Sequence, residues 1–145
     1  MINSFSGQHR WLSNFHPAPV IAYGITFQSV EHAYQACKCA LAGERHRFLN
    51  ITAGQAKRLG RTVEMRSDWL DVRLRLMKEL VRRKFENPEL RSLLLSTGTT
   101  VLVEGNQWGD TFWGVCKGVG ENHLGLILME IREELRAHVS LKPLI

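Results

Sequence analysis

The segment SVEHAYQACK at residues 29–38 decides the fold of this 145-residue chain. Apolar residues recur in it and just after it at intervals of three and four, which predicts an α-helix that runs to about Leu41. Ser29 precedes the first apolar position and is a suitable N-cap, because its hydroxyl can accept a hydrogen bond from a free backbone amide. The apolar stripe of this helix consists of Val30, Ala33, Tyr34, Cys37 and Leu41.

Turn and cap signals organise the chain on both sides of this helix. Before it, residues 19–22 and 25–27 flank a turn at Gly24 and predict a short β-hairpin. After it, Thr52 begins a second helix, because Gln55 stands three residues later and completes a capping box. Strands and helices therefore both occur in the first half of the chain.

Helical signals dominate the second half of the chain. We expect a helix from Trp69 to about Glu86 behind an Asp68 cap, a short helix from Pro88 to Gly98, a strand over residues 99–104, a glycine-rich loop over 105–120, and a last helix from an Asn122 cap to about His138. No repeat or linker divides the sequence. The expected fold class is therefore α+β, a helix-rich single domain with a few short strands over residues 1–145.

Charge and cysteine content restrict the kind of protein. Lys plus Arg is 19 and Asp plus Glu is 14, and the resulting net charge of +5 favours anionic partners. Three cysteines in no framework spacing fit the reducing cytoplasm. The apolar run at residues 124–129 is far shorter than the ~20 residues that span a bilayer. We expect a soluble cytoplasmic protein without a membrane partner, a metal or a cofactor.

Three polar residues, Glu31, Gln35 and Lys38, share one stripe of the first helix at offsets of four and seven. Two turns separate the first from the last by ~10 Å, because a helix rises about 1.5 Å per residue. A substrate could bridge them, with the carboxylate on a ribose hydroxyl and the amine near the anomeric carbon. A solvated polar face explains the same spacing.

A basic segment, GQAKRLGR, occupies residues 54–61 just after the Thr52 cap. Its cations, Lys57, Arg58 and Arg61, follow a helix N-terminus, whose free amides already attract anions. Like charges three and four residues apart also share a helix face at some cost in stability. The segment indicates a phosphate site, and a basic surface helix paired with scattered carboxylates explains it equally well.

The loop WGDTFWG at residues 108–114 combines aromatic residues with glycine. Trp113 offers a flat surface that can stack on a base, and Asp110 could orient water or bond a ribose hydroxyl. Alternatively, the rings fill the core and Asp110 caps a turn. The density of tryptophan and glycine favours the functional interpretation.

Motifs along almost the whole chain occur in an order typical of one family. They are Leu12–Phe15, Ser29–Gln35 with Lys38, Gly54–Arg61, Asp68–Trp69, Lys84–Phe85, Leu102–Glu104, Asp110 with Trp113–Gly114, and Gly120 to Arg132. Each motif is weak by itself, but their number and order are specific. The chain resembles the NADAR family, the YbiA-like proteins with proposed roles in NAD and ADP-ribose chemistry.

The resemblance implies N-glycosidase activity, in which the bond between ribose C1 and a base nitrogen is hydrolysed. Together with the constellations above, it implies catalytic residues Glu31, Lys38 and Asp110 and substrate-binding residues Asn14, Gln35, Lys57, Arg58, Arg61, Trp69 and Trp113. Lys38 matches a lysine that can form a Schiff base with the opened ribose, a route that needs an amine of depressed pKa. In a second route, carboxylates stabilise an oxocarbenium-like transition state.

Two substrate classes are associated with the family. We expect ADP-ribose attached to guanine in DNA, which would make ADP-ribosylated DNA the partner of this chain. The alternative is a phosphoribosyl-amine intermediate of riboflavin biosynthesis. A hypothesis from a different class is a non-catalytic sensor of NAD or ADP-ribose, which would use the same residues without turnover.

Overall fold

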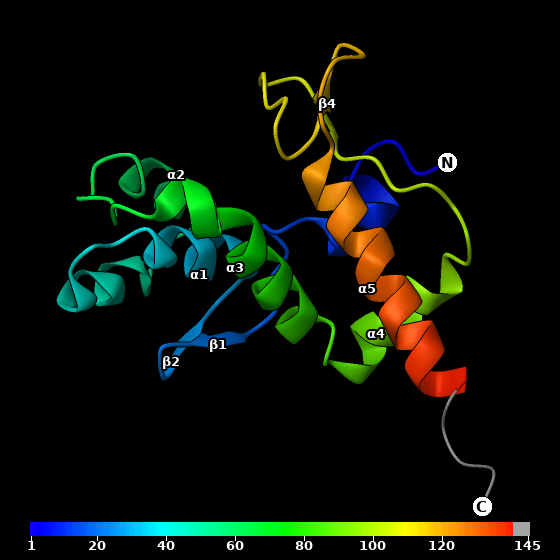
Figure 1. The fold of residues 1–145 in the computed structure, drawn as a ribbon, viewed down its shortest axis with the longest axis horizontal. Coiled ribbons are helices and arrows are strands. Elements are labelled where there is room, and N and C mark those ends of the chain that lie inside the picture. Colours follow the sequence, from blue (N-terminus) through cyan, green and yellow to red (C-terminus); the bar gives the residue numbers. More distant parts are fainter. Residues whose placement is uncertain (141–145) are drawn as a thin grey trace, which may run out of the picture. The chain divides into compact units, whose positions relative to one another are not determined.

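The computed structural model describes residues 1–140 (Figure 1). Its helices are α1 (Val30–Cys37), α2 (Ala53–Leu59), α3 (Trp69–Lys84), α4 (Pro88–Ser96) and α5 (His123–Ser140), with the 3₁₀ helices η1 (Gly7–Leu12) and η2 (Ala42–Phe48). Short strands β1 (Val20–Ala22) and β2 (Ile25–Phe27) form one pair, and β3 (Gly105–Asn106) and β4 (Val115–Cys116) form another. The predicted class, α+β and rich in helix, is confirmed.

The chain is divided into two compact units. Residues Asn14–Lys84 form the α1–α3 unit, and Met1–Ser13 together with the chain from Phe85 onward form the α4–α5 unit. A single domain over residues 1–145 stays a prediction. Within residues 1–140, no helix has both the length and the apolar character needed to cross a membrane.

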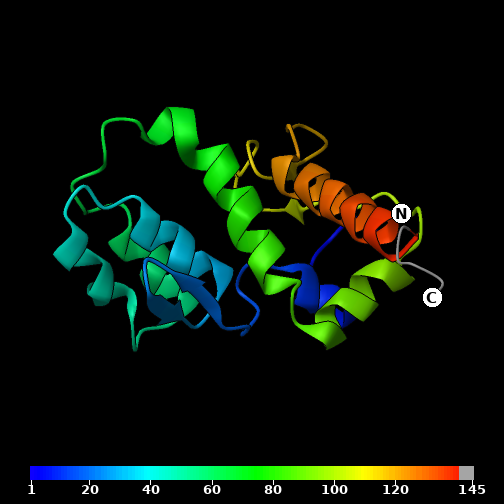
Figure 2. The same cartoon turned by 60° about the horizontal axis from the view of Figure 1, so that its bottom comes forward.

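The predicted β-hairpin of the α1–α3 unit is confirmed. Strands β1 and β2 pair in antiparallel register, with Val20 opposite Phe27. Tyr23 and Gly24 turn the chain with φ angles of 55° and 71°. This left-handed conformation matches the twist of a tight hairpin and costs glycine nothing. Both strands contact α1, and Figure 2 shows the hairpin against this helix.

Helix α1 is the centre of the α1–α3 unit. It begins as predicted, because the Ser29 hydroxyl accepts a hydrogen bond from the backbone N–H of His32. All of its residues are buried. It contacts η2, α2 and α3 as well as the hairpin, so the other elements of the unit pack around it.

The predicted end of this first helix at Leu41 is wrong, because α1 ends at Cys37. The carbonyl of Lys38 accepts a hydrogen bond of 2.8 Å from the backbone N–H of Arg66. The next residue forms an isolated antiparallel bridge with Met65. Strand-like pairing with a distant segment therefore replaces the last helical turn that the periodicity predicts.

Helices α2 and α3 begin where the sequence predicts. Both bonds of the capping box are present: Gln55 N–H donates to Thr52 Oγ1 at 3.1 Å, and Thr52 N–H donates to Gln55 Oε1 at 2.8 Å. The carboxylate of Asp68 accepts bonds of 2.6 and 3.0 Å from the Arg66 guanidinium. The residue before α3 therefore forms an ion pair with the segment that leads into the helix.

Helix α4 of the α4–α5 unit has the predicted boundaries. The side chain of Asn87 caps it by accepting hydrogen bonds from two backbone amides of the first turn. Gly98 follows the helix with a φ of 63°, which favours glycine and stops the helix. Helices α4 and α5 pack on each other.

The predicted strand over residues 99–104 is wrong. Ile2 forms an isolated parallel bridge with Leu102, and the strand β3 begins only at Gly105. The main chain of Ile2 bonds Val101 O and Val103 N–H at 2.9 and 2.8 Å. Residues 99–104 include β-branched residues as a strand would, but they pair with the N-terminal segment through this one bridge alone, so no strand forms.

Asn122 precedes α5 as predicted, and its carbonyl accepts a hydrogen bond of 3.0 Å from Leu126 N–H, but its side chain does not cap the helix. Its φ is 56°, and its side chain bonds the main chain of an earlier segment instead. The Oδ1 atom accepts from Glu104 N–H at 2.9 Å, and Nδ2 donates to Leu102 O at 3.0 Å. A Cβ atom at Gly125 would lie 2.2 Å from Leu102 O, so the close approach of α5 requires glycine there.

Candidate functional site

The polar stripe of α1 is buried. Glu31 is 7% exposed and Gln35 is 5% exposed, so the interpretation of a solvated face is wrong for both. Gln35 Nε2 donates a hydrogen bond of 2.8 Å to Glu31 Oε1. Within the described part of the chain, Gln35 Oε1 accepts no hydrogen bond. The backbone of Gly60 covers this oxygen, since a Cβ atom at Gly60 would lie 1.9 Å from it.

The amine of Lys38 lies beside two aromatic rings at the end of α1. Its Nζ is 6.0 Å from the ring centroid of Tyr34 and 5.9 Å from that of Trp69. These two rings pack on each other with their centroids 5.0 Å apart. The rings exclude water from one side of the half-buried amine and attract its charged form only weakly at this distance.

The electrostatic surroundings of Lys38 favour the neutral amine. Burial lowers the pKa of Lys38 below its ordinary value, and the positive charges of Arg61 and Lys57 lower this pKa further. The carboxylate of Glu31 opposes them by stabilising the ammonium form. A larger fraction of Lys38 is therefore neutral, and nucleophilic, than of an exposed lysine.

Helix α2 and the residues directly after it present the basic residues of the site. Lys57 is half-buried, whereas Arg58 and Arg61 are exposed. A Cβ atom at Gly60 would lie 1.9 Å from Gln35 Oε1, so glycine lets the end of α2 approach the polar stripe of α1. Two of the three predicted phosphate ligands, Lys57 and Arg61, thus lie within electrostatic reach of the lysine amine.

Asn14 supports the start of α1. Its carbonyl accepts a hydrogen bond of 3.1 Å from the backbone N–H of Glu31. Its side-chain Nδ2 donates to the sulfur of Met77 at 3.4 Å, a weak bond, because thioether sulfur is a poor acceptor. The buried Asn14 therefore fixes the position from which the Glu31 side chain projects.

Asp110 shapes its own loop in the α4–α5 unit. Its Oδ1 accepts hydrogen bonds from the backbone N–H groups of Phe112 and Trp113 at 3.1 and 2.8 Å. The side chain of Asn106 bonds both the N–H and the carbonyl of Asp110. The turn-capping interpretation therefore describes one carboxylate oxygen of Asp110.

The ring of Trp113 is half-buried. Its centroid lies 4.9 Å from that of Phe112, in an edge-to-face arrangement of 87°. Asp110 and Trp113 belong to the α4–α5 unit. The α1–α3 unit contains the other predicted site residues and brings together Glu31, Gln35, Lys38, Lys57, Arg61 and Trp69, with Asn14 behind Glu31.

Tyr34 is a neighbour of Lys38 that the sequence interpretation assigned to the core alone. It is buried, as predicted, but its ring also faces the lysine amine. The signal that could have found it is spacing, because residues four apart on a helix are neighbours. A tyrosine four residues before a candidate nucleophile on a helix is therefore expected to lie beside its reactive group.

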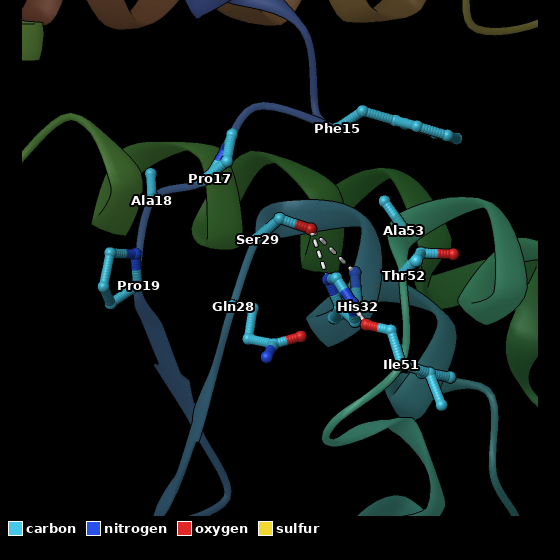
Figure 3. A pocket seen from close by; sticks show the side chains of 10 residues that line it. All are labelled: Phe15, Pro17, Ala18, Pro19, Gln28, Ser29, His32, Ile51, Thr52 and Ala53. Carbon is cyan, nitrogen blue, oxygen red and sulfur yellow. Dashed lines mark hydrogen bonds between the residues drawn. The ribbon is translucent and has the colours of Figure 1, made fainter.

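A cavity of about 480 Å³ opens at the other end of α1 (Figure 3). Its lining consists of Phe15, Pro17, Ala18, Pro19, Gln28, Ser29, His32, Ile51, Thr52 and Ala53, and includes no predicted site residue. His32 Nε2 must donate to the carbonyl of Ile51 at 2.7 Å, so Nδ1 accepts from the Ser29 hydroxyl at 2.6 Å. One ring nitrogen of His32 thus holds the segment before α2, and the other bonds the Ser29 cap of α1.

Comparisons with known proteins agree with this fold. The NADAR domain model matches residues 3–136. An N-glycosidase of Nostoc punctiforme is 38% identical over 139 residues, covering 89% of this chain and 87% of its own length. N-glycosidase YbiA of Escherichia coli is 36% identical over 137 residues, covering 91% of this chain and 85% of its own length.

The chain is also similar to a longer protein and to a solved structure. A riboflavin biosynthesis protein of Vibrio vulnificus is 42% identical over 135 residues, and this chain spans only 36% of that relative's length. The NMR structure of YbiA from E. coli superposes with a TM-score of 0.86 at 32% identity, covering 99% of this chain and 91% of that one.

These findings define the class of protein as a small α+β N-glycosyl hydrolase. The chain belongs to the NADAR family.

Proposed function

We propose that this N-glycosidase hydrolyses the bond between ribose C1 and a base nitrogen, and that its substrate is ADP-ribose attached to guanine in DNA. The observation that carries the proposal is the Lys38 amine. It is half-buried beside two aromatic rings, its pKa is lowered, and Glu31, Lys57 and Arg61 act on its charge. A carboxylate, a nucleophilic amine and phosphate-binding cations are the groups that a phosphorylated ribosyl substrate requires.

The bond changes of the proposed reaction balance without a cofactor. Opening of the ribose ring leaves C1 doubly bonded to the base nitrogen. The neutral Lys38 amine gives its lone pair to C1, the bond from C1 to the base nitrogen breaks, and the base leaves with a proton. Water then adds to C1 of the lysine Schiff base, which releases the sugar aldehyde and restores the amine.

Buried Glu31 binds a ribose hydroxyl in this mechanism and carries protons between the amine, the base and water. Its hydrogen bond with Gln35 holds the carboxylate in place. The positive charges of Lys57, Arg58 and Arg61 bind the phosphates of the ADP-ribosyl group, and Trp69 forms part of the wall.

The family resemblance supports roles for Asp110 and Trp113 in the same reaction. Because Oδ1 of Asp110 is bonded to loop amides, we assign the substrate hydrogen bond to its other oxygen. The half-buried ring of Trp113 provides a surface on which a base stacks.

A phosphoribosyl-amine of riboflavin biosynthesis is the second candidate substrate. It is supported by the names of relatives in V. vulnificus and Zea mays, which are both called riboflavin biosynthesis proteins. Such a substrate also has a C1–nitrogen bond and a phosphate, so the same residues could serve it.

We also propose that the protein acts in the cytoplasm. Its three cysteines, Cys37, Cys39 and Cys116, are free thiols. A reducing compartment keeps thiols in this state.

Trapping with borohydride tests the proposed mechanism. Borohydride added during turnover of an ADP-ribosylated oligonucleotide is expected to reduce the Schiff base and leave the sugar on Lys38, detected by peptide mass mapping. Lys38→Ala should form no adduct and lose about a thousandfold in kcat/KM. Full activity of Lys38→Ala would exclude the lysine route, and release of base only from a phosphoribosyl-amine would select the second substrate.

A further inference from the structure

A second group of cations surrounds the turn of the β-hairpin, in the α1–α3 unit. Tyr23, Arg45 and Arg66 form what we term the Tyr23 cluster. The Arg45 guanidinium, from η2, lies 3.6 Å from the centroid of the Tyr23 ring. Arg66, from the segment between α2 and α3 (Figure 1), donates a hydrogen bond of 3.4 Å to the Tyr23 hydroxyl. Three separate segments thus place two guanidinium groups at one phenol.

The charge of Arg45 is not neutralised. Within residues 1–140, no carboxylate lies within ion-pair distance of Arg45, and its buried Nε has no hydrogen-bond partner. By contrast, Arg47 in the same 3₁₀ helix pairs with Glu44 at 2.5 Å. Arg66 pairs with Asp68 at 2.6 Å. The Tyr23 cluster therefore carries one positive charge in excess.

A further guanidinium group lies beside the Tyr23 cluster. Glu79 pairs with Arg82 at 2.8 Å and with Arg83 at 3.1 Å. Arg83 also donates a hydrogen bond of 2.6 Å to the carbonyl of Ile21, two residues before Tyr23. An anion at the Tyr23 cluster would therefore meet the excess charge of Arg45, with Arg83 beside it.

We propose that the Tyr23 cluster binds a phosphate of the nucleic-acid strand that flanks the modified base. This inference rests on the proposed function, in which Lys57, Arg58 and Arg61 already serve the phosphates of the ADP-ribosyl group. A small substrate has no further anion for a second cationic site, whereas a strand carries a phosphate at every nucleotide. The planar guanidinium suits phosphate oxygens. Tyr23 as a residue is 45% exposed, and an aromatic ring of this kind can contact a neighbouring base.

Arg45→Gln tests the inference, with Arg47→Gln as the matched control from the same 3₁₀ helix. We would measure the anisotropy of a fluorescent, unmodified single-stranded oligonucleotide over a range of salt concentrations. Arg45→Gln should weaken binding by about threefold to tenfold and reduce the slope of log affinity against log salt by about 1, because one phosphate contact is lost. Arg47→Gln should change neither quantity. Arg45→Lys, which keeps the charge, should retain the wild-type slope.

Equal affinity of Arg45→Gln and the wild type would overturn the inference. Equal weakening by Arg45→Gln and Arg47→Gln would also overturn it, because only general electrostatics would then act. Binding of inorganic pyrophosphate, measured with the same variants, tests whether the Tyr23 cluster takes a free anion. If Arg45→Gln weakened pyrophosphate binding but not oligonucleotide binding, the site would serve small anions rather than a strand.

Turnover of the ADP-ribosylated oligonucleotide separates this inference from the proposed function. Binding that depends on Arg45, without release of ADP-ribose, would reject the proposed substrate and retain the strand site. Release of ADP-ribose with no effect of Arg45→Gln on binding or turnover would reject the strand site and retain the proposed function.

Discussion

The surroundings of Lys38 and the Asp110 loop use polar side chains in opposite ways. Near Lys38, side chains act on one another: Gln35 bonds the Glu31 carboxylate, and the charges of Arg61 and Lys57 add to burial in lowering the pKa of Lys38. In the Asp110 loop, polar side chains bond mainly the main chain, although Asn106 Nδ2 also donates to the Glu104 carboxylate at 3.0 Å. Asn106 and Asp110 together form four hydrogen bonds to backbone N–H and carbonyl groups of the loop.

The difference distinguishes side chains that can take part in a reaction from side chains that hold the backbone in place. Buried side chains that interact mainly with other side chains can change their charge or their partners when a substrate arrives. Side chains bonded to the backbone cannot do so without changing the loop. Asp110 can both hold the loop and take part in the reaction only if Oδ1 bonds the loop amides and Oδ2 bonds the substrate.

Asp110→Asn is expected to have the largest effect of the four variants that follow. The amide oxygen of asparagine can still accept the loop hydrogen bonds, so the melting temperature should stay within about 2 °C of the wild type. Loss of the charge should lower kcat/KM by about tenfold to a hundredfold. Calorimetric melting and base-release assays would check both values. Unchanged activity would make Asp110 purely architectural and sharpen the contrast between the two regions.

Gly60→Ala should disturb the Lys38 surroundings through Gln35. The added methyl group would lie 1.9 Å from Gln35 Oε1, so the amide must move and weaken its bond to Glu31. We expect kcat/KM to fall by about tenfold. Gly43→Ala is the control, because nothing lies within 4 Å of a Cβ atom there. Equal activity of the two variants would show that the orientation of Gln35 does not matter.

Arg61→Gln should alter the pH dependence of the reaction. Arg61 lowers the pKa of Lys38, so its removal should raise this pKa and move the acid limb of the rate profile to higher pH. The rate at pH 7 should fall by about threefold, because less amine is neutral. Arg58→Gln is the control, because it removes the same charge from a residue that does not lower the pKa of Lys38. The acid limb should stay in place in this variant. An unmoved limb in Arg61→Gln would exclude Lys38 as the titrating nucleophile.

Lys84→Met should affect stability and leave the rate profile in place. Burial lowers the pKa of Lys84 to about 7 from 10.5, so between these values the unfolded chain binds more protons than the folded one. Stability of the wild type should therefore rise from pH 7 to pH 10 by on the order of 3 kcal/mol relative to Lys84→Met. Urea unfolding at both values measures this. Equal slopes would show that Lys84 titrates normally.

Local signals predicted the fold well where each element depends on its own residues. The Thr52–Gln55 capping box, the Ser29 cap and the turn at Gly24 all lie where the sequence predicts them. Predictions failed where a distant segment competes. A hydrogen bond from Arg66 to Lys38 takes the place of the last helical turn predicted for α1. At residues 99–104, only Ile2 forms a bridge, so no strand forms there.

The site followed the same division. Helical spacing placed Glu31, Gln35 and Lys38 on one stripe, and the motif order identified the family. Spacing did not reveal that Glu31 and Gln35 are buried, or that Tyr34 faces the amine. Arg45 carries no local signal at all, because its importance lies in the absence of a counter-charge across three segments.

The sequence by itself determined most of the helices, several of their caps and the family, since these depend on residues close together in the chain or on motif order, and it singled out Lys38 as a candidate nucleophile. The tertiary structure decided which polar groups are buried, where α1 ends, and how the charges of Lys57 and Arg61 act on Lys38. Burial and electrostatic interaction depend on distances through space, and such distances exist only after the chain has folded.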